Sequence, residues 1–524
     1  MEKRAEAPEA ELSRKLMTSY IEQIVTTTRN FTGYENPGKS LYMVIREMVE
    51  NSLDAIEQAT VDHPYVNIVV ESVEGKTSGV DQMHKVSCKD NGIGVKHAEI
   101  PAMFAQLLQS SKSEHRQTRG KFGMGVKNAL LYSMDKTSKP MEVESEVMKS
   151  MYKSMYELRM DIDTGTPIIV KEQQETKEPF TQGTQVALTV FGNWASYRNN
   201  ILNFIRQTAM VTPYVSFNLT YIYNVKRAPY KLNSPRNDTE KPCSPRTAKY
   251  DPSSFFQKAR SLPGGHLRLA DFLINEFDGV DKKVATDFIA KLGSTLFQEI
   301  NCDCLTPLGV HLIAGVKFLL GDDVLLGEYR SKPSSYEGHP YIVEAVITTL
   351  DSSAPREGFA TIVQGLNIFR FANRTPLLLE GTSDVIVQVA KKIGWDTYGL
   401  HKLEDKICIF VSFVSTYVPF TGLAKEAISG RQNIPTVIQE VLEGCCNDFL
   451  AKKKPGMSKR QRVVDAAVKY HVDMMRGCTR MTDAAEPQHV LDFNKDHLAL
   501  DSTESMYREK LEERYMMLNK DKLI

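Results

Sequence analysis

The sequence has no apolar run long enough to cross a lipid bilayer. Its longest strongly apolar stretch, ICIFVSFVSTYVPF at 407–420, falls short of the about 20 residues that a membrane-spanning helix needs, and is more typical of a buried strand. The first residues, MEKRAEAPEAELSRK, are charged and lack the apolar centre of a signal peptide. These absences predict an intracellular protein with no membrane partner.

Cysteine pairs at zinc-binding spacing are also missing. Eight cysteines occur among 524 residues, and they include Cys302 with Cys304 and the neighbours Cys445 and Cys446. No second pair lies at a spacing that would complete a zinc site. We therefore expect reduced, structural thiols and a reducing compartment.

An excess of charge of one sign is absent as well. The 65 basic and 65 acidic residues cancel, so contact with nucleic acid must come from local basic patches. Two such patches are the basic segment 226–252 and the cluster KKKPGMSKRQR at 452–462. Both are candidate contacts to a phosphate backbone, and the second is also typical of a nuclear-localisation signal. Either patch could equally be a solvated charged surface.

A chain of 524 residues exceeds what one hydrophobic core usually organises, so several domains are expected. Residues 1–225 alternate helical patterns with β-rich runs, which predicts an α/β sandwich of one sheet covered by helices. The helical patterns lie at 10–30, 39–59, 124–133 and 197–210, and the β-rich runs at 65–73, 84–90 and 183–192.

The composition changes after residue 225. Segment 226–252 has five prolines and predicts a linker, and 253–305 has short amphipathic helical patterns that predict a small helical module. Residues 306–475 are mixed, and 476–524 form a polar tail. The mixed domain has predicted strands at 341–350, 365–372 and 407–420, a helix at 383–394 and a long helix from about 434. The predicted fold class is therefore α+β, with several domains.

The stretch REMVENSLDA, residues 46–55, is the first candidate for chemistry. At 100° per residue, Glu47, Asn51 and Asp54 fall in one stripe of the predicted helix. The opposite side is apolar, with Ile45, Met48, Val49 and Ile56. Such a helix can present a carboxylate and an amide to a ligand, but taken alone the stripe is equally consistent with a solvated polar face.

Three glycine-containing motifs follow. In KDNGIG, residues 89–94, Asp90 can accept a hydrogen bond from an amino group while the glycines let a flat ligand approach, although a plain turn is the simpler alternative. In QTRGKFGMGVKNALLYS, residues 117–133, three glycines lead into a helix whose free N–H groups can hold phosphates. This motif has no G-K-[ST], so it is no Walker P-loop. In QGTQV, residues 182–186, Gly183 and Thr184 open a strand.

In this order the four motifs resemble the Bergerat ATP-binding fold shared by gyrase-type topoisomerases, the Hsp90 chaperone, MutL proteins and histidine kinases. The resemblance narrows to the B subunit of DNA topoisomerase VI, closest to the eukaryotic, plant-like branch, over about residues 15–455. The segments that carry this narrower resemblance are NPGKSLYMVIREMVENSLDA, SSK at 110–112 before QTRGKFGMG, IRQTAMVTPY at 205–214, GLNIFRFANRTPLLLEG at 365–381 and VPFTGLAKEAI at 418–428.

The resemblance implies a role for each site residue. Glu47 would be the general base, Asn51 a ligand of Mg²⁺, Asp90 the acceptor for the adenine amino group, and Lys425 a transducer residue that contacts the γ-phosphate of ATP. Apart from the resemblance, Glu50 lies at the edge of the stripe and is expected to be structural, and Asp54 either bonds within the pocket, caps or is solvated. The adenine pocket would be completed by Gly94 and Thr184, and the phosphates wrapped by Ser111, Lys112, Gly120, Lys121, Phe122, Gly123, Met124, Gly125, Val126 and Lys127.

The implied function is that of the ATPase subunit of a type IIB topoisomerase. ATP would close two B subunits around DNA, a separate A subunit would cleave the DNA, and two of each subunit would form a heterotetramer, in the nucleus if the source is eukaryotic. Segment 253–305 stands where this family has a helix-two-turn-helix domain. Segment 460–478 is a candidate A-subunit contact, although its apolar spacing is equally consistent with internal packing. The alternatives are a structural partner of a meiotic recombination nuclease without ATP turnover, and an Hsp90-like or MutL-like ATPase.

Overall fold

The computed structural model describes residues 34–235, 281–287 and 302–453, each range with short gaps. The predicted helix at 10–30, most of segment 236–305 and everything after 453 lie outside the described residues. The basic cluster 452–462 and the predicted A-subunit contact at 460–478 are therefore not tested. Among the described helices, none is long and apolar enough to span a membrane.

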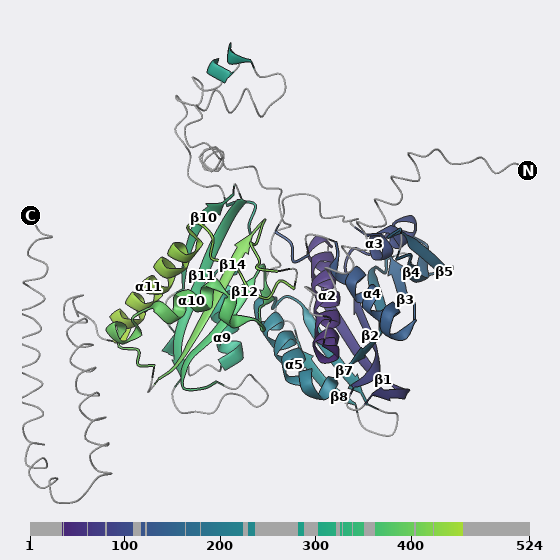
Figure 1. Ribbon diagram of the computed structural model, residues 1–524, viewed down its shortest axis with the longest axis horizontal. Helices are drawn as coiled ribbons and strands as arrows, with labels where there is room; N and C mark the ends of the chain where they lie inside the picture. The colour runs from purple at the N-terminus through teal and green to yellow at the C-terminus, as the bar shows by residue number, and fades with distance from the viewer. Residues whose placement is uncertain are drawn as a thin grey trace, which may run out of the picture.

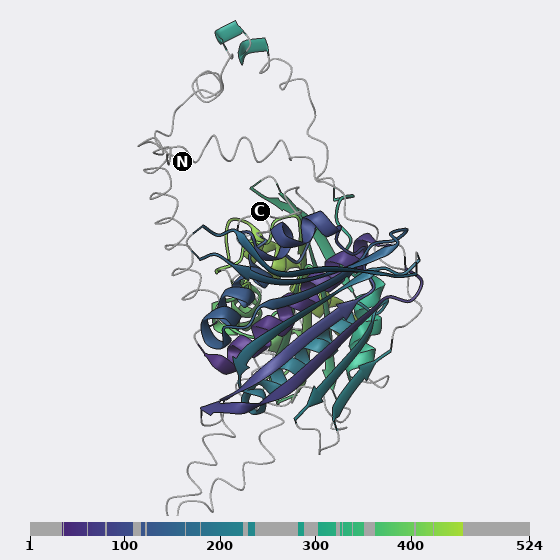
Figure 2. The same cartoon turned by 90° about the vertical axis from the view of Figure 1, so that its right-hand side faces the viewer.

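The first module, residues 34–235, is built on one large twisted sheet (Figure 2). Its described strands run in the order β5-β4-β3-β6-β2-β1-β7-β8. Neighbouring strands are antiparallel except β1 and β7, which are parallel. The strands are β1 (Tyr65–Ser78), β2 (Asp81–Asp90), β3 (Met141–Glu146), β4 (Tyr152–Met160), β5 (Pro167–Thr176), β6 (Gly183–Gly192), β7 (Ser216–Ile222) and β8 (Tyr230–Ser234).

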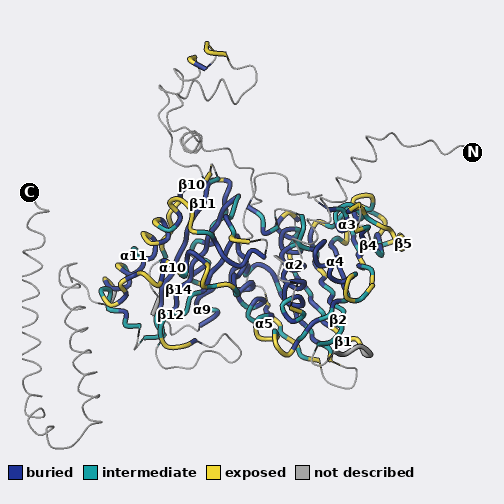
Figure 3. The backbone as a smooth tube through the Cα atoms, in the orientation of Figure 1, coloured by how far each residue is buried: buried dark blue, intermediate teal, exposed yellow. Residues whose placement is uncertain are grey.

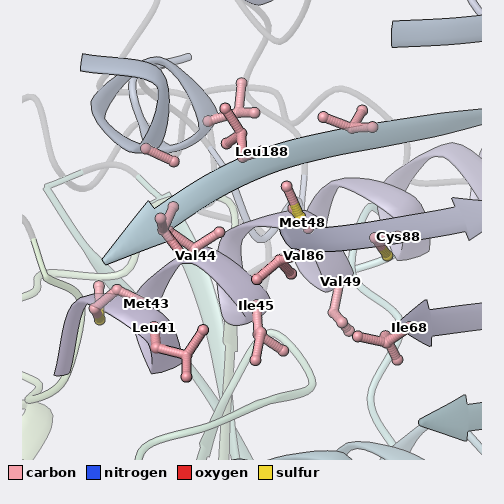
Figure 4. Packing of buried hydrophobic residues seen from close by; sticks show 14 of the residues in the cluster. Leu41, Met43, Val44, Ile45, Met48, Val49, Ile68, Val86, Cys88 and Leu188 are labelled. Atoms are coloured by element: carbon pink, nitrogen blue, oxygen red, sulfur yellow. The ribbon is translucent and has the colours of Figure 1, made fainter. Parts of the chain in front are cut away.

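Helices pack on one face of this sheet: α2 (Pro37–Gln58), α3 (Ile100–Ala105), α4 (Gly125–Thr137) and α5 (Trp194–Val211), with the short 3₁₀ helix η1 (His97–Glu99) before α3. Helix α2 begins sharply because the Asn36 side chain accepts hydrogen bonds from the amides of Gly38 and Lys39, and Pro37 occupies the first turn. Its apolar residues pack against the strands, with Val44, Met48 and Val49 beside Val86 and Leu188 (Figure 4).

Helix α2 is buried on nearly all sides (Figure 3). In the stripe that the sequence leaves open as a wet polar face, Glu47 and Asp54 are buried and Asn51 is half-buried. Glu50 and Glu57 of the same helix are also buried. The physical reason is that each carboxylate has a cationic partner: Lys425 of the second module lies against Glu47 and Glu50, and Arg119 of the first module donates to Asp54 and Glu57.

The second module, residues 302–453, has a sheet with the order β10-β11-β14-β12-β13, and β9 pairs with β11. Its strands are β9 (Leu325–Leu326), β10 (Arg330–Tyr336), β11 (His339–Leu350), β12 (Gly365–Ala372), β13 (Thr375–Pro376) and β14 (Lys406–Ser415). Its helices are α9 (Val310–Leu320), α10 (Val385–Lys392), α11 (Ile434–Lys453) and the 3₁₀ helices η2 (Gly381–Ser383) and η3 (Trp395–Tyr398). Helices α10 and α11 cover one face of the sheet.

Helix α9 covers the other face and joins the two modules (Figure 1). Its residues Leu312 and Val316 share an apolar cluster with Met210 of α5 and Phe410 of β14. The helices approach so closely that a Cβ on Gly315 would lie 2.6 Å from Cγ of Met210. The two modules therefore contact each other through one continuous apolar cluster.

Most predicted elements are confirmed. The helical patterns at 39–59, 124–133 and 197–210 correspond to α2, α4 and α5, the runs at 183–192 and 365–372 are β6 and β12, and the long helix predicted from about 434 is α11.

Two predicted boundaries are wrong. The strand predicted at 407–420 ends at Ser415, whose hydroxyl accepts from the Tyr417 amide and turns the chain before Pro419. The first residues of the predicted linker 226–252 include β8, which pairs with β7 as an edge strand. An edge strand pairs on one side only and is often short, so the alternation of polar and apolar residues that marks a strand is weak in its sequence.

Candidate functional site

The end of β2 and the start of β6 form one corner of the site. Asp90 Oδ1 accepts hydrogen bonds from the amides of Gly92 at 2.8 Å and Thr184 at 3.3 Å. The backbones are so close that a Cβ on Gly183 would lie 2.1 Å from the Asp90 carbonyl, and one on Gly94 would lie 2.0 Å from the Glu146 carbonyl. Both glycines have positive φ, so no other residue fits without strain.

Ser145, which sequence reasoning missed, connects this corner to β3. Its hydroxyl accepts from the Val95 amide at 2.7 Å and lies 3.2 Å from the Thr184 hydroxyl. A serine in an alternating strand carries no local signal for such a contact, because only the sheet order places β3 beside β6.

Asp90 is buried, and burial raises the pKa of its carboxyl to about 6. The amide hydrogen bonds from Gly92 and Thr184 oppose this rise without cancelling it. At neutral pH the group is therefore mostly ionised, and it can accept a hydrogen bond from an amino group.

Glu47 of α2 lies against the N-terminus of α4. A Cβ on Gly125 would be only 1.7 Å from Glu47 Oε2, so the glycine makes room for the carboxylate. Asn51 follows one helical turn after Glu47 and is half-buried. Within the described part of the chain, no side chain caps α4, and the N-terminus of a helix is suited to an anion. Burial lowers the pKa of Lys127, in this first turn, to about 8.

The segment before the glycines, residues 117–120, is held from two sides. Asp54 Oδ1 accepts from the Arg119 side chain at 3.1 Å and from its amide at 3.3 Å, and Glu57 accepts from the same guanidinium at 2.7 Å. Asp54 therefore anchors the start of the glycine motif, a role that its sequence position left open. From the second module, Asn373 donates to the Thr118 carbonyl at 3.0 Å.

Lys425, from the loop after β14, reaches this site from the second module. Its ammonium lies 3.7 Å from Glu47 Oε1 and 3.4 Å from Glu50 Oε2. Burial lowers the pKa of Lys425, but the two carboxylates outweigh burial and hold it above its ordinary value. The structure thus brings together Glu47 and Lys425, which the sequence placed in one site on resemblance alone.

Comparison with known proteins identifies the two modules. The family model for histidine kinase-, DNA gyrase B- and HSP90-like ATPases matches residues 39–184, and that for the topoisomerase VI B subunit transducer matches 301–463. The chain is 30% identical to the B subunit of DNA topoisomerase 6 from Arabidopsis thaliana, over 83% of this chain and 77% of that protein. The chain belongs to the topoisomerase VI B subunit family.

An archaeal relative, the B subunit of the type 2 DNA topoisomerase 6 of Saccharolobus shibatae, is 29% identical over 85% of this chain and 86% of that protein. The first module is thus the ATPase domain of a topoisomerase VI B-type subunit, which implies ATP binding, and the second is its transducer. A transducer of this type does not fit the alternative of an Hsp90-like or MutL-like ATPase.

Arg46 and Glu50 were missed as site residues. Arg46 Nε donates to Glu50 Oε1 at 2.7 Å, and both side chains are buried beside Lys425. The only local signal is their i,i+4 spacing, which ordinarily marks an exposed pair on a helix surface. Sequence reasoning gave Glu50 a structural role, whereas its carboxylate contacts two cations of the site.

Four residues predicted to wrap the phosphates, Ser111, Lys112, Lys121 and Phe122, lie outside the described residues. The other predicted members of this loop are described. Gly120 ends the segment 117–120, Gly123 and Met124 precede α4, and Gly125, Val126 and Lys127 form its first turn.

The pKa of Asp90 predicts that adenine nucleotides bind more weakly in mild acid. An amino-group donor requires the ionised carboxylate, and protonation removes this form as the pH falls through about 6. Between about pH 7.5 and about pH 5.5 the ionised fraction falls about fourfold, so the Kd for ADP should rise about fourfold, measured by calorimetry. Asp90→Asn should lose this pH dependence, and parallel profiles for the two proteins would contradict the assignment.

The contact between Gly125 and Glu47 predicts a sharp effect of one methyl group. Gly125→Ala places a Cβ where the Glu47 carboxylate now lies, and misplacing a catalytic group by about 1 Å can cost about 100-fold in rate. The rate of ATP hydrolysis, measured by phosphate release, should fall by about 100-fold. Gly444→Ala in α11 is the control, because its nearest neighbour is the flexible Arg330 side chain at 3.6 Å. Equal rates for both variants would refute the proximity argument.

Proposed function

We propose that this chain is the ATP-hydrolysing B subunit of a DNA topoisomerase VI, in which ATP binding closes two copies around DNA and hydrolysis reopens them. The observation that carries the proposal is the ion pair between Lys425 of the transducer and Glu47 of the ATPase domain, 3.7 Å apart. A residue of one domain that lies at the reaction centre of another can convert the state of the nucleotide into domain movement.

The donor set at the site fits a magnesium nucleotide. Asp90 suits an amino group, the uncapped start of α4 suits phosphates, and the Asn51 side chain can supply the oxygen that Mg²⁺ prefers. When bound, Mg²⁺ neutralises charge on the phosphate oxygens.

Each residue then has a task. Glu47, placed at the N-terminus of α4, orients or deprotonates the water that attacks the γ-phosphate. Lys425 pairs with Glu47 and Glu50. A γ-phosphate would compete with Glu47 for this ammonium, so that ATP frees the base and at the same time ties the transducer to the site.

The partners follow from the family rather than from contacts in this chain. We propose that DNA is cleaved by a separate A subunit, that two A and two B subunits form a heterotetramer, and that the complex acts in the nucleus of a eukaryotic cell. The relatives from Arabidopsis thaliana and rice, named as topoisomerase 6 B subunits, support this assignment.

The second candidate is a structural partner of a meiotic recombination nuclease that no longer turns over ATP. A chain of that kind has no need for a base, a metal ligand and a γ-phosphate contact. This chain keeps Glu47, Asn51 and Lys425, with Glu47 and Lys425 in one buried cluster. That arrangement favours the turnover enzyme.

Removing the proposed base should separate binding from turnover. Glu47→Ala should bind ATP but hydrolyse it at least about 100-fold more slowly, because general-base catalysis contributes about that much. Asn51→Ala should also lose Mg²⁺-dependent binding. Glu142→Gln on β3, where the carboxylate pairs with Lys85 at the surface, is the matched control. Normal phosphate release by purified Glu47→Ala protein would sink the general-base role.

Strand passage tests the function as a whole. With an A subunit, the chain should relax or decatenate DNA in an ATP-dependent reaction, scored on agarose gels, and Lys425→Ala should uncouple nucleotide binding from dimerisation. An absence of ATP turnover, even with DNA and the A subunit present, would instead favour the structural partner without turnover. Unchanged ATP-dependent dimerisation and strand passage in Lys425→Ala would refute the switch role.

A further inference from the structure

We propose that Arg46 is a positioning residue for Lys425: it grips the backbone of the transducer loop and thereby aims the lysine at the ATP site. The inference rests on the proposed role of Lys425. It extends that role to Arg46, a residue of the ATPase domain that is not among those predicted to bind the nucleotide.

Arg46 uses all three of its side-chain nitrogens for this contact. Nη1 donates to the Ala424 carbonyl at 3.2 Å and to the Glu426 carboxylate, Nη2 donates to the Lys425 carbonyl at 3.0 Å, and Nε donates to Glu50. The guanidinium thus binds both peptide groups that flank the Lys425 side chain, from a helix more than 370 residues earlier in the chain. A planar fork of donors is suited to such simultaneous contacts.

The loop that Arg46 holds has a strained backbone. Lys425 has a φ of +54°, a left-handed conformation that residues with a side chain rarely adopt. Local bonds close the loop, including Lys425 N to the Gly422 carbonyl at 3.1 Å and Ser429 N to the Pro419 carbonyl at 2.7 Å. In this conformation the Lys425 side chain extends from the loop towards α2. The hydrogen bonds from Arg46 to the Ala424 and Lys425 carbonyls stabilise this loop conformation.

Glu50 connects the Arg46 guanidinium to the Lys425 ammonium. Its Oε1 accepts from Arg46 and its Oε2 accepts from the Lys425 ammonium at 3.4 Å, so the loop backbone and the lysine head share one carboxylate. Burial raises the pKa of Glu50, but Lys425 and Arg46 outweigh burial and lower it, which keeps the shared carboxylate ionised. Arg370 also holds this loop, through the Glu426 carbonyl at 3.2 Å, but from within the transducer. Among the described residues, Arg46 is the guanidinium that holds the loop from the ATPase domain.

The test variant is Arg46→Lys, which keeps the charge and most of the volume but lacks the planar fork. A lysine cannot reach two carboxylates and two carbonyls at once. The first measurement is hydrogen exchange on the full-length, nucleotide-free protein. Amides of segment 419–430 should exchange about tenfold faster or more, because the loop loses buried charge-assisted hydrogen bonds.

Arg119→Lys is the matched control for exchange. Arg119 is also buried and also bridges two carboxylates, Asp54 and Glu57, but it does not contact the loop. Its substitution should leave the exchange of segment 419–430 unchanged. If Arg46→Lys folds poorly by circular dichroism, Glu426→Gln removes the charge of a partner of Arg46 at constant volume and should give the same exchange result.

The second measurement separates positioning from support of the whole site. Arg46→Lys should bind ADP within about twofold of the parent protein, since ADP has no γ-phosphate, and should lose ATP hydrolysis to about the extent that Lys425→Met does. In the double variant Arg46→Lys/Lys425→Met, the arginine change should add nothing, because the two residues act as one unit.

Three results would overturn the inference: unchanged exchange in segment 419–430, loss of ADP binding in Arg46→Lys, or a double variant well below Lys425→Met alone. Failure of the proposed function is distinguishable from these. If Lys425→Met itself hydrolyses ATP at the parental rate, the switch role of Lys425 fails, while the exchange measurement still decides whether Arg46 holds the loop.

Discussion

The buried ion cluster between α2 and the loop after β14 is the interaction on which the site depends. Two cations, Arg46 and Lys425, face three carboxylates, Glu47, Glu50 and Glu426, and all are removed from water. A buried charge is tolerated only when it is paired, and here each domain holds the partners of the other. Removing one partner without opening the interface would therefore leave an uncompensated buried charge.

The apolar contact through α9 does a different job from this ion cluster. Leu312 and Val316 pack between α5 and the transducer sheet, and such burial is favourable over a range of orientations. The ion cluster, by contrast, requires particular distances and directions. The apolar contact keeps the domains together, while the ion cluster selects one arrangement of them. A phosphate that competes for Lys425 would act on the ion cluster and not on the apolar contact.

Several elements and motifs could be predicted from the chain because their causes are local. Asn36 and Pro37 start α2, and the glycine run before Gly125 starts α4, since capping and φ preferences act over a few residues. Asp90 and Thr184 could be proposed for one pocket by resemblance. The edge strand β8 was not predicted because it depends on where its partner β7 lies. The end of β14 was predicted wrongly because the hydrogen bond from the Tyr417 amide to the Ser415 hydroxyl was not recognised.

Sequence by itself determined that α2 would carry Glu47 and Asn51 one turn apart, that a glycine-led helix would follow, and that the chain belongs beside topoisomerase VI B subunits. Only the tertiary structure decided that the acidic side of α2 is dry, that Asp54 anchors the segment before the glycines, and that Glu50 is shared by Arg46 and Lys425. The physical reason is separation: helix periodicity acts over four residues and places Glu50 beside Arg46, whereas the contacts of Asp54 with Arg119 and of Glu50 with Lys425 join residues 65 and 375 positions apart. The pairing of buried charge also depends on which surface covers it.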